Sequence, residues 1–428
     1  MRTLKGDQRV QILDALYGPI SFGEELSALI RKPVVQRMRH IRLSNIDSSA
    51  LPGIAGLNRF EHVLGTAHLS TIVGCSGALS PNERIALQAA ALMHDWAITA
   101  FGHLVEEAFA YAGSSFNHEG KLHELVASPT SSDIGGVNRQ VLCGRETGIL
   151  DWCDQVFGSE RDKYLKLITE TITGRGSLGP LIAGEIDIDN IDNLHRIAFH
   201  MGLRIDKDAP IRLSRCLLGA TESGSPIFAR DARDDLLRWV ELRRDVYTHL
   251  MLAQPDFAAK LMLLYATVHA MRAEEFTDQD WNMTDVDFVS RLLKSKVKEA
   301  RETADRWMVG EFWKMAPLLW LSGPAPEYSR VAAFSEALTK EIKRPMFAYR
   351  IKDKRERQLN IQFNSGVSEV FGRSSKKWLL GVGSPTKRGF TGVELLTIRK
   401  FGSEFFQAQV LSESTNEDTE THCQGSLI

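Results

Sequence analysis

The sequence predicts a mainly α fold with a smaller α+β region toward its C-terminal end. Over residues 22–340 apolar side chains recur at steps of three and four, as in "DDLLRWVELRRDVYTHLMLAQ" at 234–254, which is the spacing of amphipathic helices. After Pro345 the pattern changes to short apolar runs such as "LNIQF" and "WLLGVG", separated by glycine, serine and lysine. We therefore expect a helical domain over residues 1–335, a basic α+β region over 336–410 and a flexible polar tail over 411–428.

The composition is that of a soluble globular protein. With 428 residues, of which 43% are hydrophobic and 25% charged, the chain is long enough to bury a large core. Because it lacks a signal pattern and any run of about 18 apolar residues, we expect a cytoplasmic protein with no membrane partner. Its five cysteines never form a C-x-x-C pair, which argues against a cysteine zinc site.

Positive charge is concentrated in the predicted C-terminal region. Between Lys340 and Lys400 there are 15 Lys and Arg against 5 Asp and Glu, although the whole chain has a net charge of -2. Such a segment can bind phosphate groups or nucleic acid. The alternative is a basic face in contact with solvent, and the sequence leaves both interpretations open.

A helix predicted over residues 81–94 carries the first candidate site residues. Ser80 is a typical N-cap, Pro81 suits the first turn, and Glu83 completes a capping box. Alanines at four positions of this helix let neighbouring helices approach it closely. It ends in the adjacent pair His94 and Asp95, both of which are residue types that ligate metals.

Further metal ligands have to come from other helices, because adjacent helical residues point about 100° apart. His62 in "NRFEHVLGTAHLS" is one candidate, and the acidic run "GEIDIDNIDNL", which contains Asp187, Asp189 and Asp192, supplies another. Imidazoles and carboxylates together suit Mn, Fe, Ni, Co, Zn or Mg and leave positions for water or substrate. Taken singly, each motif also has a structural interpretation, since acidic residues at a helix start complement the helix dipole.

The order of these motifs resembles that of a known family. Six segments follow one another over roughly residues 10–270: "DALYGPISFGEELSALIRKPVVQRMRHIRLSNID", "NRFEHVLGTAHL", "ALMHDWAITAFGHLVEEAF", "FNHEG", "GEIDIDNIDNL" and "IFARDARDDLLRWVELRRDVYTHL". Together they are similar to the HD-domain phosphohydrolases, specifically the deoxynucleoside triphosphate triphosphohydrolase (dNTPase) branch. The resemblance implies an HD-domain helical core.

The resemblance also implies a set of site residues. Glu106 and Glu107 lie three and four residues after His103, within reach to orient its imidazole. The implied metal ligands are His62, His94, Asp95 and Asp189; the catalytic residues are His103, Glu106, His118 and Glu119; the substrate-binding residues are Gln36, Arg37, Arg59, Asn190, Asn193 and Tyr247.

The activity that the resemblance implies is metal-dependent hydrolysis of deoxynucleoside triphosphates to deoxynucleoside and tripolyphosphate. A water activated by the divalent metal ion would attack the α-phosphorus, and a histidine would protonate the departing 5'-oxygen. The family further implies a nucleotide activator and a homo-oligomer. The chain departs from the family at Ile98, where the family has a histidine, and at Asn190 and Asn193, where it has a lysine and an aromatic residue.

Two other functions remain open from the sequence. The altered substrate pocket and the basic segment favour an HD-type phosphodiesterase or nuclease acting on nucleic acid or a signalling nucleotide. The same departures would also suit a non-catalytic HD protein that senses a nucleotide. Metal-dependent release of product distinguishes the two enzymes from the sensor.

Overall fold

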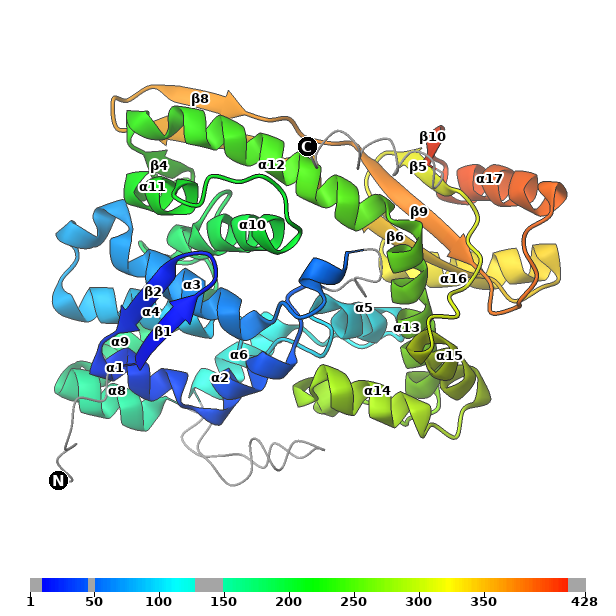
Figure 1. The fold of residues 1–428 in the computed structure, drawn as a ribbon, viewed down its shortest axis with the longest axis horizontal. Helices are drawn as coiled ribbons and strands as arrows, with labels where there is room; N and C mark the ends of the chain where they lie inside the picture. Colours follow the sequence, from blue (N-terminus) through cyan, green and yellow to red (C-terminus); the bar gives the residue numbers. More distant parts are fainter. Residues whose placement is uncertain (1–9, 45–50, 128–148, 415–428) are drawn as a thin grey trace.

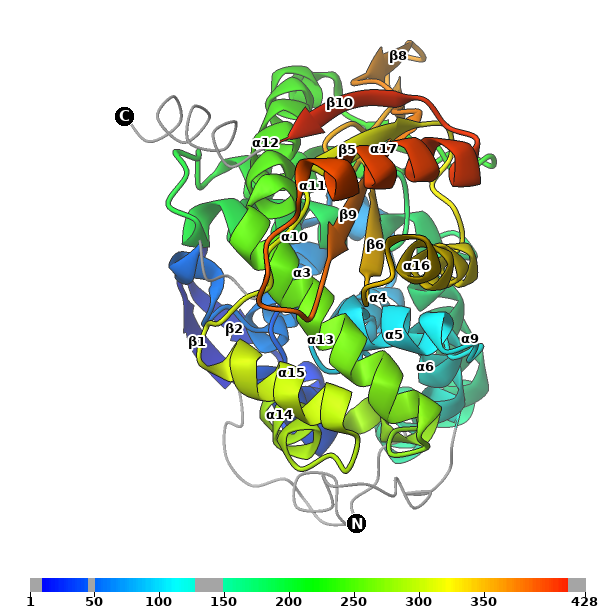
Figure 2. The ribbon, with the colours of Figure 1, turned by 90° about the vertical axis from the view of Figure 1, so that its right-hand side faces the viewer.

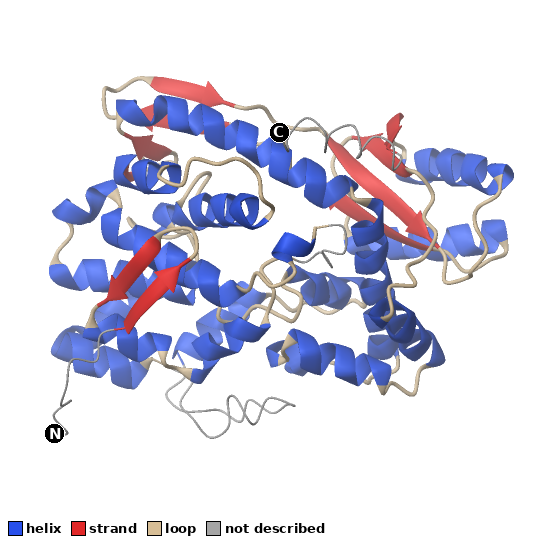
Figure 3. Cartoon of the chain, viewed as in Figure 1, coloured by secondary structure: helices blue, strands red, loops and turns tan. Residues whose placement is uncertain are grey.

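The protein is described by a computed structural model over residues 10–44, 51–127 and 149–414. Helices form most of the molecule, and apart from one N-terminal hairpin the strands gather at two places (Figures 1 and 3). The predicted mainly α fold with a smaller α+β region is therefore confirmed. Of the helices that these residues form, none combines the length and the hydropathy that crossing a bilayer requires.

The N-terminal half begins with a hairpin and continues as helices. The strands β1 (Val10–Asp14) and β2 (Gly18–Phe22) pair antiparallel. The helices that follow are α1 (Glu24–Ile30), α2 (Pro33–Arg37), α3 (Arg59–Ile72), α4 (Pro81–Met93), α5 (His103–Tyr111), α6 (His118–Ala127), α8 (Leu150–Phe157), α9 (Arg161–Ile172), α10 (Ile188–His200) and α11 (Ala209–Cys216).

Helix α4 begins and ends where the sequence predicts. The Ser80 hydroxyl accepts a hydrogen bond from the Glu83 amide, and the Glu83 carboxylate accepts one from the Ser80 amide at 2.8 Å, which completes the capping box. Ala86, Ala89, Ala90 and Ala91 are fully buried, and α4 packs against α3 and α9. His94 is the C-cap, so the interior end of this helix presents an imidazole to its neighbours.

Two hydrophobic cores lie side by side. The first is built mainly from α1 to α4 and α8 to α12, and the second from α5, α13 to α17 and the C-terminal sheet. Phe116 and Tyr247 pack against both cores. The helices that follow in the chain are α12 (Arg233–Leu252), α13 (Gln254–Arg272), α14 (Asp285–Leu293) and α15 (Lys298–Met308).

A four-stranded antiparallel sheet of order β10-β5-β9-β6 forms the C-terminal part of the second core. Helices α16 and α17 pack on one of its faces and α13 on the other, as Figure 2 shows. A Cβ at Gly381 would overlap the ring of Phe257 on α13, so the close approach of α13 to the sheet depends on this glycine. The elements are β5 (Leu318–Ser322), α16 (Tyr328–Ile342), β6 (Phe347–Lys352), β9 (Lys377–Gly383), α17 (Gly392–Phe406) and β10 (Val410–Ser414).

A second sheet connects the C-terminal region to the helical part. Its order is β3-β4-β7-β8, and the pairing of β4 with β7 is parallel, with Ile227 opposite Gln362. The strands β3 (Leu217–Ala220) and β4 (Pro226–Phe228) come from the helical part, whereas β7 (Leu359–Phe363) and β8 (Ser368–Phe371) come from the C-terminal region.

The strand pairing therefore crosses the predicted domain boundaries. Residue 336 falls inside α16, and β5, which precedes this position, pairs with β9 and β10. The predicted tail from residue 411 starts within β10, which is a paired strand as far as Ser414. Residues 415–428 of the tail lie outside the described part of the chain.

Candidate active site

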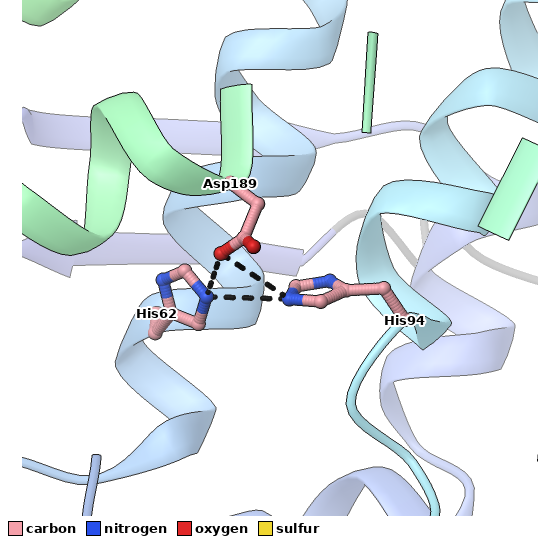
Figure 4. A group of neighbouring side chains, drawn as sticks. All are labelled: His62, His94 and Asp189. Atoms are coloured by element: carbon pink, nitrogen blue, oxygen red, sulfur yellow. Dashed lines mark hydrogen bonds and ion pairs between the residues drawn. The ribbon is translucent and has the colours of Figure 1, made fainter. Parts of the chain in front are cut away.

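Three helices bring two imidazoles and a carboxylate to one point. His62 lies on α3, His94 caps α4, and Asp189 lies in the first turn of α10 (Figure 4). His62 Nε2 is 2.9 Å from Asp189 Oδ1 and 3.3 Å from His94 Nε2, and His94 Nε2 is 3.6 Å from Asp189 Oδ1. The structure thus places together three of the four residues that the resemblance implies as metal ligands.

The other nitrogen of each imidazole has a fixed partner. His94 Nδ1 lies 2.8 Å from the Ala91 carbonyl, and His62 Nδ1 lies 2.7 Å from Asp192 Oδ2. These oxygens accept hydrogen bonds, so in the neutral imidazoles that a metal requires each Nδ1 would carry the proton, and the lone pair of each Nε2 would be directed toward the space between His62, His94 and Asp189. A second hydrogen bond of this kind is characteristic of histidines that ligate metals.

The donor set fits a divalent cation. Ligands about 2.1 Å from a metal are about 3.0 to 3.4 Å apart in octahedral or tetrahedral geometry, close to the separations between these three atoms. Two imidazoles and a carboxylate suit Mn, Fe, Co, Ni or Zn, and Mg less well. The residues that would hold the ion are His62, His94 and Asp189, with Asp95 beside them.

Asp95 is placed differently from the other three implied ligands. Its carboxylate forms a buried ion pair with Arg59, while Asp95 Oδ2 lies 3.6 Å from His94 Nε2. Burial disfavours the charged carboxylate, but Arg59 and His94 outweigh burial and lower the pKa of Asp95. Asp95 therefore remains an anion at the edge of the group.

The electrostatics of the group favour a positive charge. Burial opposes protonation of His94, but the carboxylates of Asp95 and Asp189 outweigh it and raise its pKa to about 9. At His62 burial is likewise outweighed, by the hydrogen bonds to Asp189 and Asp192, and the pKa is raised. The carboxylates that stabilise a protonated imidazole here would also stabilise a bound metal cation.

A second cluster joins His103 and His118 through one carboxylate. Glu106 Oε2 lies 3.1 Å from His103 Nδ1 and 2.9 Å from His118 Nδ1, and Glu106 Oε1 accepts the backbone N–H of His118 at 3.2 Å. Burial lowers the pKa of His103 despite this bond. At His118 burial acts in the same direction, but the hydrogen bond and the charge of Glu106 outweigh it and raise the pKa. The pKa values of the two imidazoles are therefore shifted in opposite directions.

One cavity of about 410 Å³ connects the two clusters. His94, Asp95 and Asp189 line it on one side, and His103 and His118 line it on another. The implied residues that also line it are Arg59, Glu119, Asn190, Asn193 and Tyr247.

Gln36 and Arg37 do not line this cavity, which differs from the resemblance-based expectation. Arg37 is fully buried and donates to the backbone carbonyls of Asn282 at 2.7 Å and Ile98 at 2.7 Å, so it fastens the loop after α4 to the segment before α14. The Gln36 amide donates to the Ile30 carbonyl.

Glu107 is also placed differently, since it turns away from His103. Its carboxylate accepts a hydrogen bond from the Tyr349 hydroxyl at 2.7 Å and lies 3.4 Å from Lys260 Nζ. Adjacent helical residues point in directions about 100° apart, so only one of the two glutamates can face the imidazole. Glu106 is the one that does.

Sequence reasoning gave no role to several residues that shape the site. Asp192 holds His62, and Arg196 in turn donates to Asp192 at 2.9 and 3.0 Å. The spacing of three and then four residues after Asp189 places them along one face of α10, and this was the signal available. Lys354 lines the cavity from the C-terminal region, and apart from the positive charge of its neighbours nothing in the sequence identifies it as a site residue.

The similarities to known proteins include one to a sequence relative and one to a solved structure. The chain is 24% identical over 199 residues to an uncharacterized protein of Methanocaldococcus jannaschii, a match that spans 45% of this chain and 34% of that relative. A crystal structure of a phosphohydrolase from Bacteroides thetaiotaomicron superimposes with a TM-score of 0.63 and 16% identity, covering 88% of this chain and all of the other. No family model matches the sequence. The chain thus shares its fold with a protein named as a phosphohydrolase.

Proposed function

We propose that the protein is a metal-dependent phosphohydrolase that converts deoxynucleoside triphosphates into deoxynucleoside and tripolyphosphate. The observation that carries this proposal is the convergence of His62, His94 and Asp189 beside a cavity that His103 and His118 also line. Metal ligands and a pair of histidines whose pKa values are shifted in opposite directions are the groups that hydrolysis of a phosphate ester needs. The fold shared with a phosphohydrolase adds support.

A divalent ion bound at the first cluster would lower the pKa of a water molecule and offset the charge of the phosphate. Hydrolysis at the α-phosphorus forms one bond from the water oxygen to phosphorus and breaks the bond from phosphorus to the 5'-oxygen. That oxygen is a poor leaving group unless it receives a proton as the bond breaks. The protein therefore needs a group that is protonated near neutral pH.

His118 is suited to protonate the leaving oxygen. Its Nδ1 is held by Glu106, so its Nε2 is the nitrogen left for substrate, and its raised pKa favours the protonated form. His103 shares Glu106 but has a lowered pKa, so it can accept a proton within the same cavity. The single carboxylate orients both rings.

The test is hydrolysis by the purified protein supplied with Mn or Mg. Nucleoside and tripolyphosphate should appear from at least one deoxynucleoside triphosphate, and His94→Ala should abolish the reaction. His118→Gln should slow it while metal binding persists, because His118 is not among the residues that would hold the ion. Absence of product from every nucleotide with every divalent metal contradicts the proposal and favours a non-catalytic nucleotide sensor.

One observation favours a second candidate, a phosphodiesterase acting on nucleic acid or a signalling nucleotide. In the part of the chain that the structure describes, Arg59 and Lys354 are the lysines and arginines that line the cavity, and Arg59 is already paired with Asp95. A phosphodiester carries less negative charge than a triphosphate and needs fewer cations. Cleavage of single-stranded DNA, RNA or a cyclic nucleotide, with no tripolyphosphate from any deoxynucleoside triphosphate, would identify this activity.

The basic C-terminal segment supports that candidate less than its net charge suggests. Several of its cations are paired with acidic side chains, for example Lys377 with Asp353 and Arg388 with Glu394. If nucleic acid binds there, replacing the exposed cations should weaken binding and reduce its salt dependence. The residues to replace are Lys376, Lys377, Lys387 and Arg388.

A further inference from the structure

A second cavity, of about 300 Å³, adjoins the catalytic cavity. Tyr247, Leu250 and Lys354 line both, so the two spaces meet along α12 and the segment after β6. The remaining walls come from α5, α13, α16 and β6, which pack against one another and lie together in Figure 2. A ligand held by the catalytic cavity can therefore extend into the second one.

The second cavity contains a buried ion pair. Lys260 is 4% exposed, and its ammonium lies 3.4 Å from Glu107, which also accepts the hydroxyl of Tyr349. Among the described residues Glu107 is the acceptor that the structure gives to Lys260, although an ammonium has three N–H donors. Burial lowers the pKa of Lys260 to about 8 against the opposing charge of Glu107, and the nearby Lys354 acts in the same direction as burial. The ammonium also lies 4.6 Å from the centre of the Tyr349 ring.

Aromatic rings form much of the rest of the lining. Tyr247, Tyr328 and Tyr349 all border the cavity, and the guanidinium of Arg350 lies 4.0 Å from the centre of the Tyr328 ring. Rings and a few convergent polar groups in a small cavity are typical of sites for planar ligands, and nucleobases in particular stack on tyrosine. An inorganic anion could not stack on the three tyrosine rings, whereas a planar base could.

We infer that the second cavity receives the nucleobase of the substrate while its phosphates lie in the catalytic cavity. This inference rests on the proposed nucleotide hydrolysis and adds the part of the protein that recognises the base. Lys260 donates to a carbonyl or ring nitrogen of the base, and Glu107 accepts from a neighbouring N–H, since the Watson–Crick edge of each base offers adjacent donors and acceptors. Tyr247 stands where the two cavities meet, between base and phosphate.

The test measures binding of ligands that separate base from phosphate. Metal-free full-length protein is titrated calorimetrically with each of the four deoxynucleosides, with 2-deoxyribose 5-phosphate and with inorganic tripolyphosphate. At least one deoxynucleoside should bind, and Lys260→Met should weaken that binding at least tenfold. His94→Ala should leave it unchanged, because His94 lies in the catalytic cavity only.

Two further variants keep the result interpretable. Lys314→Met replaces an exposed lysine outside both cavities and should bind the deoxynucleoside as the wild type does. The double variant Glu107→Gln with Lys260→Met removes both buried charges together, so it should fold even if the single variant does not, and it should show the same loss.

Three outcomes would overturn the inference. These are no deoxynucleoside binding at millimolar concentration, binding that survives removal of Lys260 and Glu107, and a Lys260-dependent site for tripolyphosphate instead. The proposed hydrolysis fails separately, when no phosphate ester is cleaved. A protein that hydrolyses nucleotides but binds deoxynucleosides independently of Lys260 would keep the function and lose this inference.

Discussion

Replacing Glu106 with glutamine should lower the pKa of His118. Glu106 is the carboxylate that both His103 and His118 contact, and it makes the largest contribution that opposes the effect of burial on the pKa of His118. Glutamine keeps the length of the side chain and one oxygen acceptor but removes the charge. The proton on His118 then loses its charged partner while the imidazole stays buried.

The size of the shift follows from the contact. Glu106 Oε2 lies 2.9 Å from His118 Nδ1, and a hydrogen bond between charged groups contributes about 1.5 to 3 kcal/mol, against about 0.5 to 1.5 kcal/mol for a neutral one. The loss is about 1 to 1.5 kcal/mol of stabilisation of the protonated imidazole. Because Glu106 raises the pKa of His118 above its ordinary value, His118 should titrate at lower pH in the variant than in the wild type.

The assay is an NMR titration of imidazoles labelled at Cε1, with His118 assigned from the His118→Gln variant. Glu124→Gln is the matched control. Glu124 lies on α6, the helix that carries His118, but its carboxylate pairs with Lys121 and not with a histidine. An acid is active below its pKa, so the high-pH limb of the kcat profile should move to lower pH in Glu106→Gln. If His118 titrates at the same pH in the variant and the wild type, the role assigned to Glu106 is refuted.

Three other substitutions test the support around the site. Asp192→Asn should weaken metal binding about 10- to 100-fold because Asp192 fixes His62, and dialysis against a metal buffer would show unchanged affinity if this is incorrect. Gly65→Ala should destabilise the fold by about 1 to 3 kcal/mol, because a Cβ there would overlap Asp192 and Arg196; an unchanged urea midpoint would contradict the packing. Arg37→Met should cost about 3 to 5 kcal/mol of unfolding free energy, since buried carbonyls lose their donor; a loss of substrate affinity at unchanged stability would instead return Arg37 to the substrate site.

The sequence predicts the elements of the site better than their mutual orientation. The capping box at Ser80 and the acidic start of α10 are local signals, and they locate His94 and Asp189 at helix ends. Spacing alone could not tell whether Glu106 or Glu107 faces His103, because both positions are compatible with a helical contact. The choice depends on the burial of Lys260 and Tyr349, which are far away in sequence.

Long-range packing decided the features that differ from expectation. The family resemblance implies that Arg37 binds substrate, whereas in the structure it donates to the backbone carbonyls of residues 98 and 281–283. These partners are far away in sequence, so no local pattern reveals them. The predicted C-terminal boundary missed β5 because a short apolar run between helices gives no periodicity of its own. Its pairing with β9 and β10 becomes visible only in three dimensions.

A crystal structure of the protein grown with Mn and recorded for its anomalous signal would test directly whether His62, His94 and Asp189 bind a metal. We expect one peak within about 2.0 to 2.3 Å of His62 Nε2, His94 Nε2 and a carboxylate oxygen of Asp189. The peak should be absent from crystals of His94→Ala. A metal bound elsewhere, or no peak between these three side chains at saturating Mn, would contradict this expectation.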